Sequence, residues 1–132
     1  MNDVVVYLAS PYSHPNREVL EGRAEAVSRI AALLFEAGVL VYSPIAHSHT
    51  IAAVGDLPTD FAFWDRYNRA MLERCDALFV VAIPGYDASV GVAGEMQIAR
   101  DLEIPVFVFE PSRDGLERAL SRYNALVVTA AR

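Results

Sequence analysis

Residues 85–95 combine small and polar side chains with two carboxylates, Asp87 and Glu95, and these residue types in this order could do chemistry. An apolar run precedes them, and a pattern with helical spacing follows, so they lie where a strand passes into a helix. Ser89, Gly91 and Gly94 would let backbone N–H groups approach an anion at the start of the helix. Glu95 falls on the apolar stripe of that helix, where a carboxylate is a candidate nucleophile.

Glu95 also has a purely structural interpretation. Acidic side chains near helix starts often only complement the helix dipole. If Ser89 is the N-cap, however, Glu95 lies beyond the first turn, and capping explains it poorly. Its neighbours on the stripe, three and four residues apart, are Val92, Met96, Ala99 and Leu102. Because a carboxylate on a buried stripe is costly, the functional interpretation is favoured.

The elements expected to position these residues alternate between strand and helix. Strands are expected at residues 4–9, 39–42, 77–83 and 105–109, and helices at residues 17–37, 61–74, 89–102 and 113–122. Residues 43–60 are expected to form a long irregular loop, and residues 125–129 an edge strand or an arm against a neighbour. This order predicts an α/β chain, with residues 1–132 forming one domain: a doubly wound, Rossmann-like or flavodoxin-like sheet of four to five mainly parallel strands with helices on both faces.

Polar residues follow every expected strand, and the carboxyl ends of parallel strands meet at one edge of a sheet. These segments are residues 7–13, 43–49, 85–91 and 110–113. A ligand-binding crevice is expected there.

The residues at these strand ends resemble the nucleoside 2-deoxyribosyltransferase-like superfamily. The nearest likeness is to a small bacterial branch, and relatives include the nucleoside 5′-monophosphate N-glycosidases. The resemblance extends from the first strand to about Phe109, and it is carried by Tyr7-Leu8-Ala9-Ser10-Pro11-Tyr12, Ser43-Pro44-Ile45-Ala46-His47-Ser48-His49, and Pro84-Gly85-Tyr86 with Ser89-x-Gly91-x-x-x-Glu95.

This resemblance implies attack by Glu95 on the anomeric carbon of an N-glycoside. The base leaves, and water or a second base then resolves the glycosyl-enzyme. The resemblance also implies that Tyr7 orients the nucleophile and the sugar by hydrogen bonding. Ser89 would contact a 5′-phosphate, together with Ser10, Ser13 and backbone amides of the loop after the first strand.

The sequence departs from the family pattern at Asn68, where relatives carry an Asp that protonates the leaving base or holds the sugar. An amide cannot supply a proton as a carboxylic acid does. Asp65, three residues earlier, or Asp87 in the Gly-rich loop could substitute. Alternatively, Asn68 is a binding residue in a slow or inactive relative.

Further candidate substrate-binding residues are Gly85, Tyr86, Asp87, Gly91, His47 and His49. His47 and His49 have no third ligand nearby in the sequence, so base recognition or capping is favoured over a metal site. Aromatic side chains could stack on a base or simply pack in the core, and these are Tyr12, Phe63, Trp64 and Tyr86.

Composition narrows the partners. The net charge of −6 disfavours polymeric nucleic acid, and all 11 basic residues are arginines, which excludes Schiff-base chemistry and a P-loop lysine. The single cysteine, Cys75, excludes an internal disulfide and is expected to be a packed thiol. Without a signal-like or membrane-spanning run, a cytoplasmic protein with no membrane partner is expected.

Taken together, we expect a hydrolase or transferase acting on the N-glycosidic bond of a nucleoside or nucleoside 5′-monophosphate, without cofactor or metal. The alternatives are a non-catalytic nucleotide-binding or sensor module, and cleavage of the nicotinamide bond of NAD. The latter is disfavoured because no Gly-x-Gly-x-x-Gly follows the first strand. The resemblance also implies a homodimer or homotetramer with shared sites, with the helix around Phe61, Phe63 and Trp64 as the interface.

Overall fold

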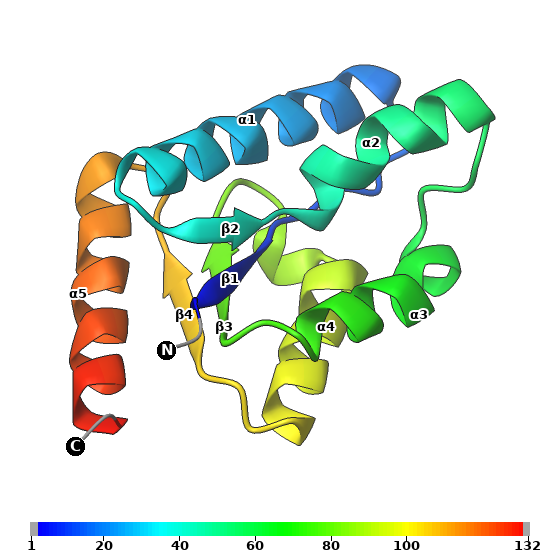
Figure 1. Ribbon diagram of the computed structural model, residues 1–132. Helices are drawn as coiled ribbons and strands as arrows, with labels where there is room; N and C mark the ends of the chain where they lie inside the picture. The colour runs from blue at the N-terminus through cyan, green and yellow to red at the C-terminus, as the bar shows by residue number, and fades with distance from the viewer. Residues whose placement is uncertain (1–2, 131–132) are drawn as a thin grey trace.

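The computed structural model describes residues 3–130 of the chain, and their side chains up to residue 126. Strands and helices alternate along it (Figure 1). In chain order they are β1 (Val5–Ala9), α1 (Arg17–Glu36), β2 (Leu40–Tyr42), α2 (Pro44–Gly55), α3 (Phe61–Leu72), β3 (Ala77–Val81), the 3-10 turn η1 (Tyr86–Ala88), α4 (Val90–Asp101), β4 (Val106–Phe109) and α5 (Arg113–Ala130).

The four strands form one parallel sheet in the order β2-β1-β3-β4. Tyr7 in the centre of β1 is in register with Tyr42 of β2 on one side and Leu78 of β3 on the other. The chain moves from β1 outward to β2, and later from β3 outward to β4 on the other side. The strand order therefore reverses between β1 and β3, and ligands of open α/β sheets bind outside the carboxyl ends of the strands at such a point.

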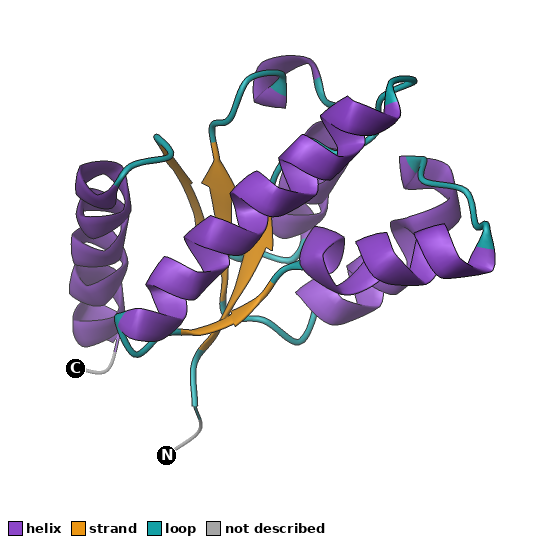
Figure 2. Ribbon diagram, turned by 90° about the horizontal axis from the view of Figure 1, so that it is seen from above, coloured by secondary structure: helices purple, strands orange, loops and turns teal. Residues whose placement is uncertain are grey.

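Helices cover both faces of the sheet, as the sequence predicted (Figure 2). Alternate residues of β1 point to opposite faces. Val6 and Leu8 belong to the core formed with α1 and α5, whereas Tyr7 belongs to the core formed with α3 and α4. The predicted doubly wound α/β fold is confirmed, with four strands that are all parallel.

The expected loop over residues 43–60 is wrong, because most of it is the helix α2. Ser43 caps this helix, since its side chain accepts a hydrogen bond from the Ala46 N–H at 3.2 Å. Pro44 occupies the first helical turn, where its missing N–H costs nothing. Asp56 ends the helix in the left-handed conformation, at φ 52°. The proline and glycine that indicated a loop thus mark the two ends of a helix.

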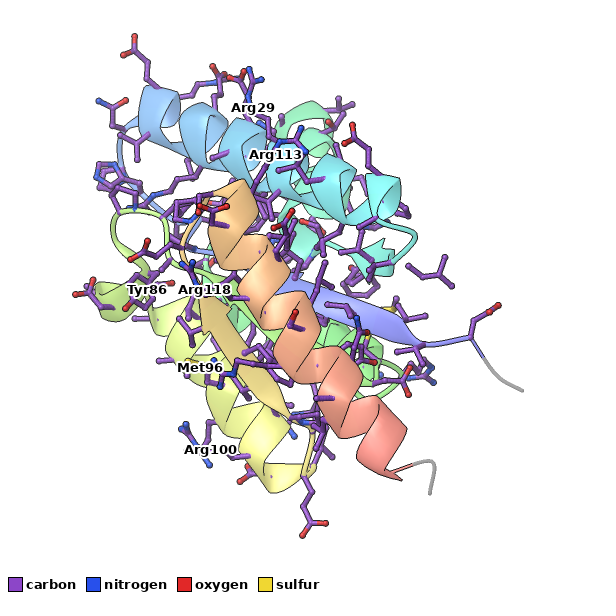
Figure 3. The ribbon with its side chains drawn as sticks, turned by 90° about the vertical axis from the view of Figure 1, so that its left-hand side faces the viewer. Arg29, Tyr86, Met96, Arg100, Arg113 and Arg118 are labelled. Atoms are coloured by element: carbon purple, nitrogen blue, oxygen red, sulfur yellow. The ribbon has the colours of Figure 1, made fainter. Side chains whose placement is uncertain are left out.

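The expected edge strand or arm at residues 125–129 is also wrong, because α5 continues to Ala130. The short helix predicted for residues 113–122 is its first part. Tyr123 extends the packing of this helix onto the sheet, edge-on to Phe79 and Phe107. Figure 3, seen from the side of α5, shows this helix lying along β4. Within residues 3–130, no helix is long and apolar enough to cross a membrane.

Candidate active site

A buried pair, Tyr7 and Glu95, joins the sheet to α4. Tyr7 is wholly buried and Glu95 is 4% exposed. The Tyr7 Oη donates a hydrogen bond to Glu95 Oε2. Ser89 fixes the start of α4 as its N-cap, since its Oγ accepts from the Val92 N–H at 3.1 Å. This start places Glu95 in the second turn of the helix, on the face that packs toward β1.

Burial sets the electrostatics of this pair. It raises the pKa of Glu95 from 4.5 to about 7, and the hydrogen bond from Tyr7 opposes the rise. Burial, followed by the nearby Glu95, also raises the pKa of Tyr7 far above its usual value, so this phenol stays a donor. The ion pairs in the described part of the chain are Arg17–Glu21 and Arg29–Glu25 on the exposed side of α1. Glu95 is therefore a carboxyl group that changes charge near neutral pH and has no cationic partner among the described residues.

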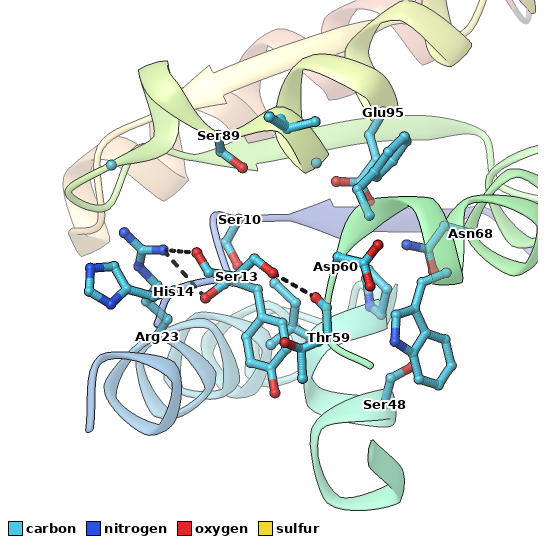
Figure 4. Close-up of a pocket in the computed structure, with 18 of the residues that line it drawn as sticks. Ser10, Ser13, His14, Arg23, Ser48, Thr59, Asp60, Asn68, Ser89 and Glu95 are labelled. Atoms are coloured by element: carbon cyan, nitrogen blue, oxygen red, sulfur yellow. Dashed lines mark hydrogen bonds between the residues drawn. The ribbon is translucent and has the colours of Figure 1, made fainter. Parts of the chain in front are cut away.

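Glu95 lines a pocket of about 560 Å³. The loop after β1, helices α1 and α2, the start of α3 and the β3–α4 connection form its walls (Figure 4). The predicted site residues that line it are Ser10, Ser13, Asn68, Gly85, Ser89, Gly91 and Glu95. The segments after β1, β2 and β3 thus meet as expected, whereas residues 110–113 after β4 are not among those that line it.

One end of the pocket is suited to an anion. Arg23 of α1 lies there, and its Nη1 donates to the backbone oxygens of Tyr12 and Ser13 at 3.3 Å and 3.0 Å (Figure 4). Gly85 permits this approach, because a Cβ at its φ of 98° would lie 2.5 Å from Arg23 Nη2. Ser89 brings the N-terminus of α4 to the same end, where backbone N–H groups favour negative charge.

A buried hydroxyl also lines this pocket. Ser10 is 4% exposed, and its Oγ has no hydrogen-bond partner among residues 3–126. Buried polar atoms of folded proteins are nearly always paired. A hydroxyl of this kind on a pocket wall is free to bond to a ligand.

The start of α3 forms another part of the wall. Trp64 is held by a hydrogen bond from its Nε1 to the Pro58 oxygen at 2.8 Å. The side chains of Asp60 and Asn68 lie on the side of the pocket away from Arg23 (Figure 4). The Asn68 Oδ1 is buried without a partner in the described part of the chain. Trp64 is half-buried and lines the pocket, so it is available for stacking on a ligand.

Several predicted residues lie outside the lining of the pocket. Tyr7 lies behind Glu95 and reaches the site only through it. His47 stacks on the Tyr67 ring at 5.7 Å, and His49 Nδ1 is 2.5 Å from the Tyr12 Oη. The remaining predicted residues that do not line the pocket are Asp65, Tyr86 and Asp87.

Sequence reasoning missed five polar residues of the pocket wall, namely His14, Arg23, Ser48, Thr59 and Asp60. Arg23 is one of several arginines on an amphipathic helix, and nothing in its spacing distinguishes it. Asp60 precedes a helix and has the pattern of an ordinary N-cap, but its side chain makes no capping hydrogen bond. Only the three-dimensional structure shows that this capping hydrogen bond is missing.

Among the described residues, no group of three or more His, Cys, Asp and Glu side chains could hold a metal ion. Cys75 is a free, buried thiol whose pKa burial raises to about 11. It is a packing residue, as predicted.

The fold and the pocket define a parallel α/β protein with a pocket at the point where the strand order reverses, and with a buried carboxyl group in the wall of that pocket. The chain belongs to the family described as a domain of unknown function (DUF1937), which matches residues 4–111. The matched region includes β1, the pocket and Glu95. No curated protein matches the sequence.

Proposed function

We propose that this protein cleaves the N-glycosidic bond of nucleoside 5′-monophosphates or nucleosides, with Glu95 as the nucleophile. The observation that carries the proposal is the Glu95 carboxyl group in the wall of a 560 Å³ pocket, hydrogen-bonded to Tyr7. A buried carboxyl group without a cation is costly to the fold, and such a cost is typical of groups kept for chemistry. The resemblance of the strand-end residues to nucleoside 2-deoxyribosyltransferases supports the same reaction class.

The proposed reaction has two steps. Ionised Glu95 attacks C1′ of the pentose, and the C1′–N bond breaks with its electron pair going to the base, which takes a proton from water. Water then attacks C1′ and gives up a proton, the bond to Glu95 breaks, and the carboxylate is restored. Tyr7 holds the carboxylate in one orientation through both steps. A second free base in place of water would give transfer instead of hydrolysis.

The polarity of the pocket supports a 5′-phosphate on the substrate. The phosphate would lie at the end formed by Arg23 and Ser89 at the N-terminus of α4. Glu95 lies away from that end in Figure 4, toward Asn68 and Asp60. A nucleotide has its phosphate, its anomeric carbon and its base in the same order.

The direct test compares the wild type with Glu95→Ala and Glu95→Gln on a panel of nucleosides and nucleoside 5′-monophosphates. Chromatography measures the free base, with and without a second base as acceptor. We expect both variants to lose base release by a factor of about 10³ or more while remaining folded, since the covalent step needs the carboxylate. Glu117→Gln on the exposed side of α5 is the matched control and keeps wild-type turnover. Unchanged turnover in Glu95→Ala would refute the nucleophile.

The second candidate is a non-catalytic nucleotide-binding module, which Asn68 favours. An amide in the pocket wall binds but does not protonate a leaving base. Thermal stabilisation by nucleotides with no base released, even at high protein concentration, would support this candidate. A gain of activity in Asn68→Asp would indicate a degenerate enzyme instead.

We also propose that copies of this chain associate around the pocket. Large apolar side chains are exposed there, among them Val90 in the pocket wall and Phe63 on α3. Light scattering after size exclusion should give a dimer or tetramer, and Phe63→Ser should shift it toward the monomer. A wild-type monomer at micromolar concentration would contradict this.

A further inference from the structure

Asp60 is an acidic side chain that the fold itself does not use. It stands at the N-cap of α3, where an aspartate normally accepts a hydrogen bond from the helix backbone, yet it makes none. No arginine pairs with it among the described residues. Its carboxylate instead lines the pocket, on the side away from Arg23 (Figure 4). Asp60 is exposed, and its ionised carboxylate can accept hydrogen bonds from a ligand in the pocket but cannot donate them.

The surroundings of Asp60 fit a flat heteroaromatic ring. Trp64, one helical turn further on, presents its indole to the pocket, and the bond to the Pro58 oxygen fixes its orientation. Ser48 of α2 and Asn68 of α3 add a hydroxyl and an amide. Sites that bind nucleobases usually combine an aromatic side chain, on which the base stacks, with polar groups around it.

We propose that Asp60 is a specificity-determining residue that accepts a hydrogen bond from the exocyclic amino group of the nucleobase. The inference depends on the proposed function, which directs the base toward this part of the pocket. A carboxylate attracts the amino group of cytosine or guanine, and it repels the carbonyl oxygen that uracil carries at the same position as the amino group of cytosine. The preferred substrates are therefore nucleotides of amino-bearing bases.

Two pairs of ligands differ at that group. Guanosine and inosine monophosphates differ only by an amino group against a hydrogen. Cytidine and uridine monophosphates differ by an amino group against a carbonyl, and their ring N3 is an acceptor in cytosine and an N–H donor in uracil. Titration calorimetry on the Glu95→Gln protein measures their dissociation constants without turnover. We expect the amino-bearing member of each pair to bind about tenfold more tightly, because charge-assisted hydrogen bonds are worth that much.

Asp60→Asn in the Glu95→Gln background should abolish the preference in both pairs. Asparagine and serine are both good N-caps, so Asp60→Asn and Asp60→Ser should keep α3 folded, which thermal unfolding verifies. The matched control is Asp65→Asn, an acid on the same helix that does not line the pocket, and it should leave the preference unchanged.

The outcomes separate the two proposals. If none of the four nucleotides binds, and none of the corresponding nucleosides binds either, the proposed function is wrong, and the role of Asp60 with it. If nucleotides bind with equal affinity within each pair, or if the preference survives both Asp60 variants, the role of Asp60 is refuted while the proposed function stands.

Discussion

Replacing Glu95 by glutamine should stabilise the protein, and increasingly so as the pH rises. Burial raises the pKa of Glu95 from 4.5 to about 7, so between these values the folded chain holds a proton that the unfolded chain has released. Because the folded state binds more protons, the free energy of unfolding falls as the pH rises through this window. Glutamine has no charge to bury, and its carbonyl oxygen still accepts the hydrogen bond from Tyr7.

The size of the effect follows from the two pKa values. Each pH unit between them is worth about 1.36 kcal/mol, so the ionised carboxyl group costs the fold about 3 kcal/mol once the pH is well above the folded-state pKa. The free energy of unfolding therefore falls by about 2 kcal/mol between roughly pH 5.5 and pH 8. The full cost applies because Glu95 is buried and no cation in the described part of the chain pairs with it to offset the cost.

Urea unfolding of wild type and Glu95→Gln at both pH values measures the difference. We expect the advantage of the variant to grow by about 2 kcal/mol from the lower to the higher pH. Glu117→Gln, on the outer side of α5, is the control and should show no such growth. If the difference in the free energy of unfolding between variant and wild type does not change with pH, or if it shrinks as the pH rises, the assignment of a buried, unpaired carboxyl group at this position is refuted.

The pH dependence of activity should follow the same group: kcat/KM for base release should rise with pH to a plateau above about 7, since only ionised Glu95 attacks. Tyr7→Phe removes the hydrogen bond that lowers the pKa of Glu95, so the pH profile of this variant should move to higher pH. An unchanged profile would show that Tyr7 does not control the pKa of Glu95. Arg23→Ala should weaken calorimetric binding of a nucleoside monophosphate by about tenfold or more, and that of the nucleoside little, whereas an equal loss for both would argue against the phosphate position. Gly85→Ala should cost about 1–2 kcal/mol in urea unfolding, because its φ is 98° and the new Cβ would meet Arg23, and a neutral result would show that this loop rearranges.

The sequence predicted the buried carboxyl group of Glu95 better than it predicted the other residues of the pocket wall. Glu95 was found because a carboxylate interrupts an apolar stripe with helical spacing. Tyr7 lies in a strand whose alternation places it opposite that stripe. The inference about Glu95 uses only local periodicity, which survives in the folded chain because the sheet and α4 bury the faces that the pattern indicates. Tyr7 was expected from the resemblance of the strand-end residues, not from the periodicity.

Local patterns failed where tertiary contacts decide the outcome. Helix α2 has few buried residues, chiefly Pro44, Ile45 and Ala52, so no one-sided stripe marks it. Its end signals, a capping serine before a proline, also occur in loops. Arg23 lies in α1, and Asp60 lies at the start of α3. Only the packing of these two helices near the carboxyl ends of β1 and β3 brings both side chains to one pocket. The spacing of these two residues in the sequence does not predict that they line the same pocket.

Asn68 bears directly on how Glu95 can work. Helices α3 and α4 pack against each other, and Asn68 and Glu95 line the same pocket from them. An aspartate at position 68 would offer an acid to the leaving base, but its negative charge would raise the pKa of Glu95 further above 7. The neutral amide of Asn68 keeps Glu95 ionisable near neutral pH, and it leaves the proposed reaction without a proton donor at this position. The chain should therefore act best on bases that leave without strong acid assistance, and Asn68→Asp should move the rise of the pH profile to higher pH whatever it does to the rate.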